Sequence, residues 1–158
     1  MSDIEVSRVI AAAPEVLYDI VSDLPRMGEL SPENTGGMWL DDASGPSVGA
    51  KFRGTNSDHK EKHWATVATI DEADRGRAFS FRVAVGPIKI SRWAYTFEPV
   101  DDGTRVTESW TDLRGWFAKK LGGMASGVND RPEFNRESIE ATLTNLARAA
   151  RARGASDR

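Results

Sequence analysis

The central region of the chain, from residue 34 to residue 112, consists of short segments rich in β-branched and aromatic residues, separated by clusters of Gly, Pro, Asp and Ser that are typical of turns. Alternation of apolar and polar positions is clearest at 93–97 and 106–110, where every second side chain faces the same way. Short connections at 86–87 and 101–103 predict antiparallel hairpins. Strands are expected at residues 4–10, 37–40, 50–56, 63–71, 78–85, 88–98 and 104–112.

Helical periodicity occurs at both ends of the chain. Near the start, apolar residues follow Pro14 at helical spacing as far as Leu24, and a short helical turn is expected at 25–30. Near the end, four apolar residues form one stripe and predict a helix over residues 132–152, with a length of ~30 Å at ~1.5 Å per residue. That stripe consists of Ile139, Leu143, Leu146 and Ala150. A short amphipathic segment at 116–121 is followed by Gly122-Gly123, which is either a break or a hinge for a pocket lid.

This order of elements predicts an α+β fold, in which a curved antiparallel sheet of six to seven strands wraps around the long C-terminal helix. One or two short helices follow the first strand. The length of 158 residues fits one domain, which we expect to span residues 1–153 and to be followed by a disordered tail at 154–158.

Composition excludes several classes of function. The absence of cysteine rules out disulfides, a thiol nucleophile and thiolate metal sites, and no apolar run approaches the ~20 residues of a membrane span. A net charge of −3 without a clustered basic surface argues against nucleic-acid binding. His59 and His63 lie in a polar context that does not favour a metal site, and we expect neither a metal nor a cofactor. We expect a cytoplasmic location, and the sequence leaves open whether the protein forms a homodimer.

A curved sheet closed by one helix leaves a space inside unless large side chains fill it. Large rings facing small helix residues are compatible with a tight core or with an apolar cavity of the size that small-molecule sites have, ~300–1,000 Å³. If the cavity exists, its ligand is expected to contact Trp39, Phe52, Trp64, Phe81, Trp93, Tyr95, Glu108, Trp110, Ile139 and Leu143.

Three stretches of the sequence resemble the START-like superfamily, in particular its bacterial polyketide cyclase/dehydratase-like (SRPBCC) members. The stretches are VSRVIAAAPEV at 6–16, WAYTFEP at 93–99 with DGTRVTESW at 102–110, and NRES at 135–138 before the leucines of the last helix. The resemblance covers about residues 4–152. It implies a helix-grip fold with a deep pocket for an apolar ligand, and it implies no catalytic motif that can be assigned to positions of this chain.

The chemistry that the sequence offers centres on Glu108. It shares a strand face with Val106 and Trp110, so on the inner face it would be a carboxyl group among rings, with a raised pKa. The alternative is that Glu108 pairs with Arg82 or Arg92 and only satisfies the interior. Tyr95 and Tyr18 could donate a hydrogen bond to a ligand carbonyl, or each could bond to a backbone acceptor.

Three functions are therefore in competition. The preferred one is binding of a hydrophobic, lipid- or polyketide-like small molecule between the sheet and the last helix. The second is a polyketide cyclase or dehydratase that uses Glu108 and Tyr95 for proton transfer. The third is a protein-interaction module with a filled core.

Overall fold

The computed structural model describes residues 2–57, 61–115 and 131–156. It contains seven strands, two helices and a 3₁₀ helix in these ranges. In chain order they are β1 (Ile4–Ile10), α1 (Pro14–Val21), η1 (Leu24–Glu29), β2 (Asn34–Trp39), β3 (Lys51–Ser57), β4 (His63–Asp74), β5 (Ala78–Val85), β6 (Ile88–Val100), β7 (Gly103–Asp112) and α3 (Arg131–Ser156). The expected α+β class and order of elements are confirmed.

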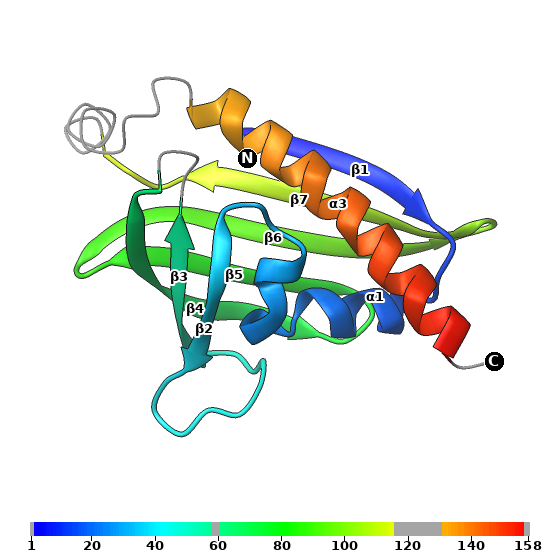
Figure 1. Cartoon of the computed structure of the whole chain (residues 1–158), viewed down its shortest axis with the longest axis horizontal. Coiled ribbons are helices and arrows are strands. Elements are labelled where there is room, and N and C mark those ends of the chain that lie inside the picture. The colour runs from blue at the N-terminus through cyan, green and yellow to red at the C-terminus, as the bar shows by residue number, and fades with distance from the viewer. Residues whose placement is uncertain (1, 58–60, 116–130, 157–158) are drawn as a thin grey trace.

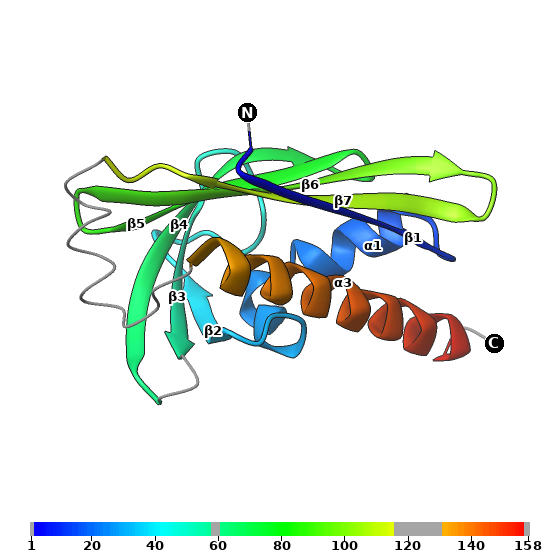
Figure 2. The same cartoon turned by 90° about the horizontal axis from the view of Figure 1, so that it is seen from above.

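The strands form one antiparallel sheet in the order β1-β7-β6-β5-β4-β3-β2. Because β1 and β2 are its two edges, α1 and η1 carry the chain from one edge to the other across the same face of the sheet. The sheet curls, and α3 lies along its concave side together with α1 (Figures 1 and 2). This is the curved sheet around a terminal helix that the sequence predicts.

Several element boundaries differ from the expectation. The strand expected at 37–40 begins at Asn34, and β4 continues to Asp74 through a register shift near Ile70, so two residues assigned to the following turn belong to the strand. The first helix ends at Val21, whereas its apolar spacing continues to Leu24. A 3₁₀ helix begins at Leu24, and Pro25 lies in its first turn. The last helix runs to Ser156, so residues 154–156, which were assigned to a disordered tail, are helical.

Two side-chain hydrogen bonds hold α3 against the elements around it. Arg8 of β1 donates to Thr144 Oγ1 at 3.1 Å, and Asn145 Nδ2 donates to the carbonyl oxygen of Leu30, after η1, at 2.7 Å. α3 therefore has polar contacts with both sides of the concavity. The predicted stripe of Ile139, Leu143, Leu146 and Ala150 is buried along its whole length.

The hairpin between β6 and β7 needs glycine at one position. Gly103 has a φ of +137°, and a Cβ atom there would lie 2.1 Å from the carbonyl oxygen of Ile10. The next residue, Thr104, donates its hydroxyl to the carbonyl oxygen of Ala12 at 2.7 Å. This close approach fixes the start of β7 against the end of β1, and so sets which β7 side chains face inward.

Candidate functional site

The concave face of the sheet is hollow at one end. A cavity of about 550 Å³ lies between the strands and the first half of α3, within the range of small-molecule sites. Its rings come from five neighbouring strands: Phe52 from β3, Trp64 from β4, Phe81 from β5, Trp93 and Tyr95 from β6, and Trp110 from β7. Strand alternation explains this, because each ring occupies an inward position of its strand.

The cavity has an open end and a buried end. Lys62, Val85 and Ile88 line it and are exposed, so they mark its mouth at the tips of two hairpins. Tyr95 and Glu108 line it as well, and each is only 2% exposed. A ligand that enters between the hairpins would therefore meet aromatic walls first and a carboxyl group last.

Glu108 and Tyr95 face each other across the β6–β7 ladder. The Tyr95 hydroxyl donates to Glu108 Oε1 at 2.7 Å, and both residues are fully buried. Burial raises the pKa of Glu108 to about 8, although the hydrogen bond from Tyr95 opposes the shift by favouring the charged form. Burial, with the adjacent Glu108, also raises the pKa of Tyr95 well above its usual 10. At neutral pH both groups are therefore mainly protonated.

The expected inner position and raised pKa of Glu108 agree with the structure, and the alternative pairing does not. Arg82 binds Asp71 with a shortest distance of 2.8 Å, and Arg92 donates to Ser80 Oγ at 3.1 Å. The partner of Glu108 is Tyr95 instead, because Arg82 and Arg92 lie at strand positions that do not face the cavity. The prediction that an arginine neutralises Glu108 is wrong.

Seven of the ten residues expected to contact a ligand line the cavity: Phe52, Trp64, Phe81, Trp93, Tyr95, Glu108 and Trp110. The other three do not. Trp39 packs edge-on against Phe52, with ring centroids 5.3 Å apart, while Ile139 and Leu143 are fully buried in the core. Tyr18 is also absent from the wall and lies edge-on to Phe79 and Phe97, each at 6.0 Å. These four side chains stabilise the fold and do not border the cavity.

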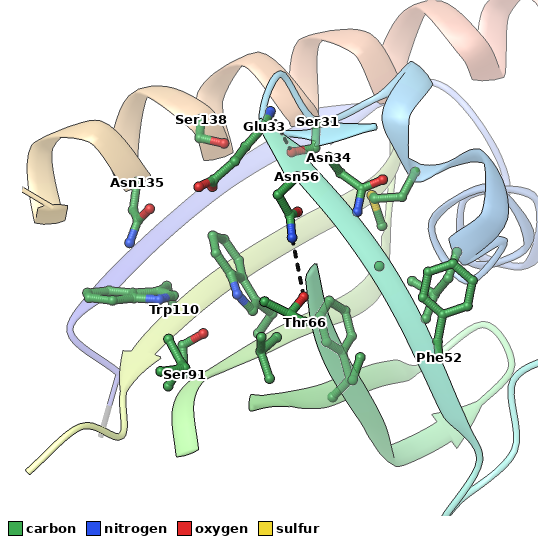
Figure 3. Close-up of a pocket in the computed structure, with 18 of the residues that line it drawn as sticks. Ser31, Glu33, Asn34, Phe52, Asn56, Thr66, Ser91, Trp110, Asn135 and Ser138 are labelled. Carbon is green, nitrogen blue, oxygen red and sulfur yellow. Dashed lines mark hydrogen bonds between the residues drawn. The ribbon is translucent and has the colours of Figure 1, made fainter. Parts of the chain in front are cut away.

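The helix side of the cavity is polar, which the sequence analysis missed. Asn135, Ser138 and Thr142 line the cavity and are nearly inaccessible to solvent. Figure 3 shows Asn135 and Ser138 pointing from α3 toward the sheet, with Asn135 above Trp110. Their spacing of three and four residues places them on one face of the helix. That spacing was visible in the sequence, but the neighbouring apolar stripe drew the interpretation to Ile139 and Leu143.

A second polar group lies on the wall near β2 and β3. Glu33 is 9% exposed and, in Figure 3, extends from the β2 side toward the cavity. Asn56 Nδ2 donates to Thr66 Oγ1 at 3.3 Å, which links β3 to β4 on the same wall. Near the other side, Arg114 binds Asp112 through two nitrogens, at 3.0 and 2.9 Å. Glu33 and Arg114 were also missed, since each stands in a connection beside a strand end, where alternation gives no direction.

No metal site is apparent in the parts of the chain that the structure describes, where three or more acidic, His or Cys side chains never gather. His63 belongs to those parts and is exposed, but His59 lies outside them. The suggested lid around Gly122-Gly123 also lies outside the described residues. Among the described helices, none has both the length and the apolar composition that a bilayer crossing requires.

The curved antiparallel sheet around a C-terminal helix is the helix-grip fold. The chain belongs to the family described as "Polyketide cyclase / dehydrase and lipid transport", whose model matches residues 1–151. No protein with a curated description matches the chain. The resemblance drawn from the sequence is confirmed.

Solved structures agree on the fold. A Polyketide_cyc-like protein of Corynebacterium glutamicum is 29% identical, with a TM-score of 0.56 and coverage of 90% of this chain and 88% of that one. A protein of Chromobacterium violaceum is 16% identical, with a TM-score of 0.70 and coverage of 95% and 98%. The di-domain ARO/CYC StfQ from the steffimycin biosynthetic pathway is 14% identical, with a TM-score of 0.74; the match covers 96% of this chain and 51% of StfQ.

Proposed function

We propose that this protein binds a hydrophobic small molecule, lipid- or polyketide-like, in the cavity between the sheet and α3. The observation that carries the proposal is a cavity of about 550 Å³ with aromatic walls and an exposed mouth. Aromatic rings supply most of the apolar area that a flat or polycyclic ligand would bury. Family membership supports the same class of ligand.

The experiment is a pair of tryptophan substitutions on β5. Val83 lines the cavity, whereas Ala84 is the next residue of the strand and its side chain points to the opposite face. Val83→Trp should fill the cavity and weaken binding of a hydrophobic dye such as Nile red at least ~tenfold, while Ala84→Trp should leave it unchanged. Circular dichroism checks that both variants fold. Equal dye affinity in the two variants would contradict binding in the cavity.

The natural ligand can be sought in the same pair of variants. Solvent extraction of the purified protein followed by mass spectrometry should release a small molecule in an amount comparable with the protein. Val83→Trp should release much less of it than Ala84→Trp, because only the first substitution takes up cavity volume. A compound recovered equally from both variants would be a contaminant.

The hydrogen bond between Tyr95 and Glu108 favours a second candidate, a polyketide cyclase or dehydratase. Such an enzyme needs a proton donor close to a ketone or a leaving hydroxyl, and Glu108 with its raised pKa fits that role. Binding is the better supported of the two, since Glu108 and Tyr95 are both mainly protonated at neutral pH and neither then serves as a base. The third hypothesis assumed a filled core, and a cavity of about 550 Å³ does not agree with that assumption.

Substitution of Glu108 by Gln separates these candidates. Gln has the shape and the donor of the neutral acid but cannot transfer a proton. A binding protein with Glu108→Gln should retain its ligand, whereas a cyclase should retain its ligand and lose turnover of a poly-β-ketone substrate. Tyr95→Phe serves as the companion variant, because it removes the hydrogen bond and leaves the carboxyl group in place.

A further inference from the structure

The buried end of the cavity contains two polar atoms that no described residue satisfies. They are Glu108 Oε2 and Asn135 Oδ1, both inaccessible to solvent and both without a hydrogen-bond partner among the residues that the structure describes. Buried polar side-chain atoms in proteins nearly always have a partner, since an unpaired one loses its hydration without compensation. Two such atoms in one cavity suggest that the partner is a ligand.

The two atoms come from opposite walls. Glu108 lies on β7, two residues before Trp110 on the same strand face, and Asn135 lies on α3, where Figure 3 shows it above the Trp110 ring. The other carboxyl oxygen of Glu108 already accepts the hydrogen bond from Tyr95, which leaves Oε2 to carry the proton of the neutral acid. Glu108 therefore offers a donor to the cavity, and Asn135 offers an acceptor.

We infer that this end of the cavity is a subsite for a neutral, oxygen-bearing group on an otherwise apolar ligand: a carbonyl or hydroxyl oxygen accepts a hydrogen bond from Glu108, and a hydroxyl donates to Asn135. The inference rests on the proposed binding function and narrows its ligand class to ketones, phenols and alcohols with an apolar skeleton. The sequence pattern named Glu108 as a candidate ligand contact but not Asn135, and the family description specifies neither residue.

The subsite disfavours an acyl chain or a carboxylate at the buried end. An acyl chain would leave both polar atoms unpaired, and a carboxylate would need a cation there. Among the described residues, the cationic groups on the cavity wall are Lys62, which is exposed at the mouth, and Arg114, which is held by Asp112. An anionic head group would therefore lie at the mouth and place its apolar chain against Glu108 and Asn135.

The test uses ligands of one shape that differ only in oxygen. Fluorene has no polar atom, 9-fluorenone adds a carbonyl and 9-fluorenol adds a hydroxyl. Displacement of Nile red from the wild-type protein at pH 6 should give affinities for fluorenone and fluorenol at least ~tenfold higher than for fluorene. If all three bind with equal affinity, the protein is a binding protein and the subsite is wrong. If none of the three compounds binds although Nile red binding depends on Val83, the subsite is wrong. If Nile red does not bind either, the proposed function itself fails.

Variants assign the effect to the residues. Glu108→Leu should abolish the preference for fluorenone over fluorene, while Glu108→Gln should keep it because the amide still donates. Asn135→Leu should weaken fluorenol binding and leave fluorene unchanged. A fluorenone preference that survives in Glu108→Leu, or a fluorenol affinity that survives in Asn135→Leu, would overturn the assignment of that residue.

The pH dependence gives an independent readout. Ionisation of Glu108, with its pKa of about 8, removes the donor, so the fluorenone preference of the wild type should decline between pH 7 and pH 9. Among the residues that the structure describes, Tyr95 is the titratable group hydrogen-bonded to Glu108, and the α3 wall opposite contributes Asn135, Ser138 and Thr142. The charged residues elsewhere on the described wall are Glu33, Lys62 and Arg114. In Glu108→Gln the preference should not change with pH. The same decline in that variant would assign the titration to another of these groups and overturn the role of Glu108.

Discussion

The two ends of the concave face are built from the same strands, but one end is filled with packed side chains and the other encloses a cavity. At the packed end, Phe79 of β5 and Phe97 of β6 are buried against Tyr18 of α1, and Val106 of β7 is fully buried. At the hollow end, the same three strands place Phe81, Trp93 and Trp110 around the cavity. The strand pattern does not change between the two ends, so alternation alone does not decide whether an inward ring packs or borders a space.

The elements that cover the sheet make the difference. α1 covers the packed end with four buried side chains, and α3 adds Leu143 and Leu146 there. Over the hollow end α3 instead presents Asn135, Ser138 and Thr142, which are polar and of which Ser138 and Thr142 are also smaller than leucine. The comparison indicates that the helices, rather than the sheet, determine where this fold keeps a cavity.

Removing one ring from each end should give the largest contrast. Phe79→Ala should lower the free energy of unfolding by about 3–5 kcal/mol, because the side chain is fully buried and leaves a hole. Trp93→Ala should cost much less, roughly 1–2 kcal/mol, since half-buried Trp93 already borders a space. Urea denaturation measures both. Equal losses would mean that Trp93 is packed as tightly as Phe79, and the contrast between the ends would not hold.

The raised pKa of Glu108 predicts that the free energy of unfolding falls as the pH rises. The folded protein favours the neutral acid, so it binds more protons than the unfolded chain between the ordinary Glu pKa of 4.5 and the folded value of about 8. Its contribution is complete below pH 4.5 and should be lost as pH rises to about 8, by an amount on the order of a few kcal/mol. Chemical denaturation at several pH values measures this loss.

A matched variant identifies the group responsible. Glu108→Gln should remove most of the pH dependence of the free energy of unfolding. Glu98→Gln is the control, because Glu98 is an exposed residue of β6 that pairs with Arg105 at 2.9 Å. If the decline with pH persists undiminished in Glu108→Gln, another group causes it and the raised pKa of Glu108 is contradicted.

Much of the fold could be predicted from the sequence, because strand alternation and one long apolar stripe are local signals. Alternation also grouped Trp93 with Tyr95, and Glu108 with Trp110, on one face of each strand, and the structure shows that this is the face that lines the cavity. The helix wall could not be predicted in the same way. Asn135 and Ile139 are four residues apart and so lie close together around the helix axis, and only the way α3 rests on the sheet decides which of them meets the cavity and which meets the core. Glu33 and Arg114, at the ends of strands, depend on the tertiary fold for the same reason.

Substitution by larger side chains should also destabilise the packed end more than the hollow end. Leu146→Phe at the packed end should destabilise the protein by roughly 1–3 kcal/mol, because Leu146 is fully buried and no space is available for a larger ring. Val83→Phe at the hollow end should leave the free energy of unfolding within about 0.5 kcal/mol, since the ring can enter the cavity. Thermal denaturation of both variants measures the difference. A large loss in Val83→Phe would show that the cavity does not accept a side chain.

The smallest effect is expected at Thr142, and it tests why the helix wall is polar. The Thr142 hydroxyl donates to the Ser138 carbonyl oxygen at 2.8 Å within α3. Thr142→Val removes this donor, but the carbonyl oxygen still belongs to the backbone hydrogen bonds of the helix and is not left unpaired. The free energy of unfolding should change by less than ~1 kcal/mol. The adjacent Leu143→Thr, which places a hydroxyl and a smaller side chain at the packed end, should cost several times more. If Thr142→Val proves as harmful as Leu143→Thr, the polar face of α3 is required for folding, and the argument that it is kept for a ligand loses its basis.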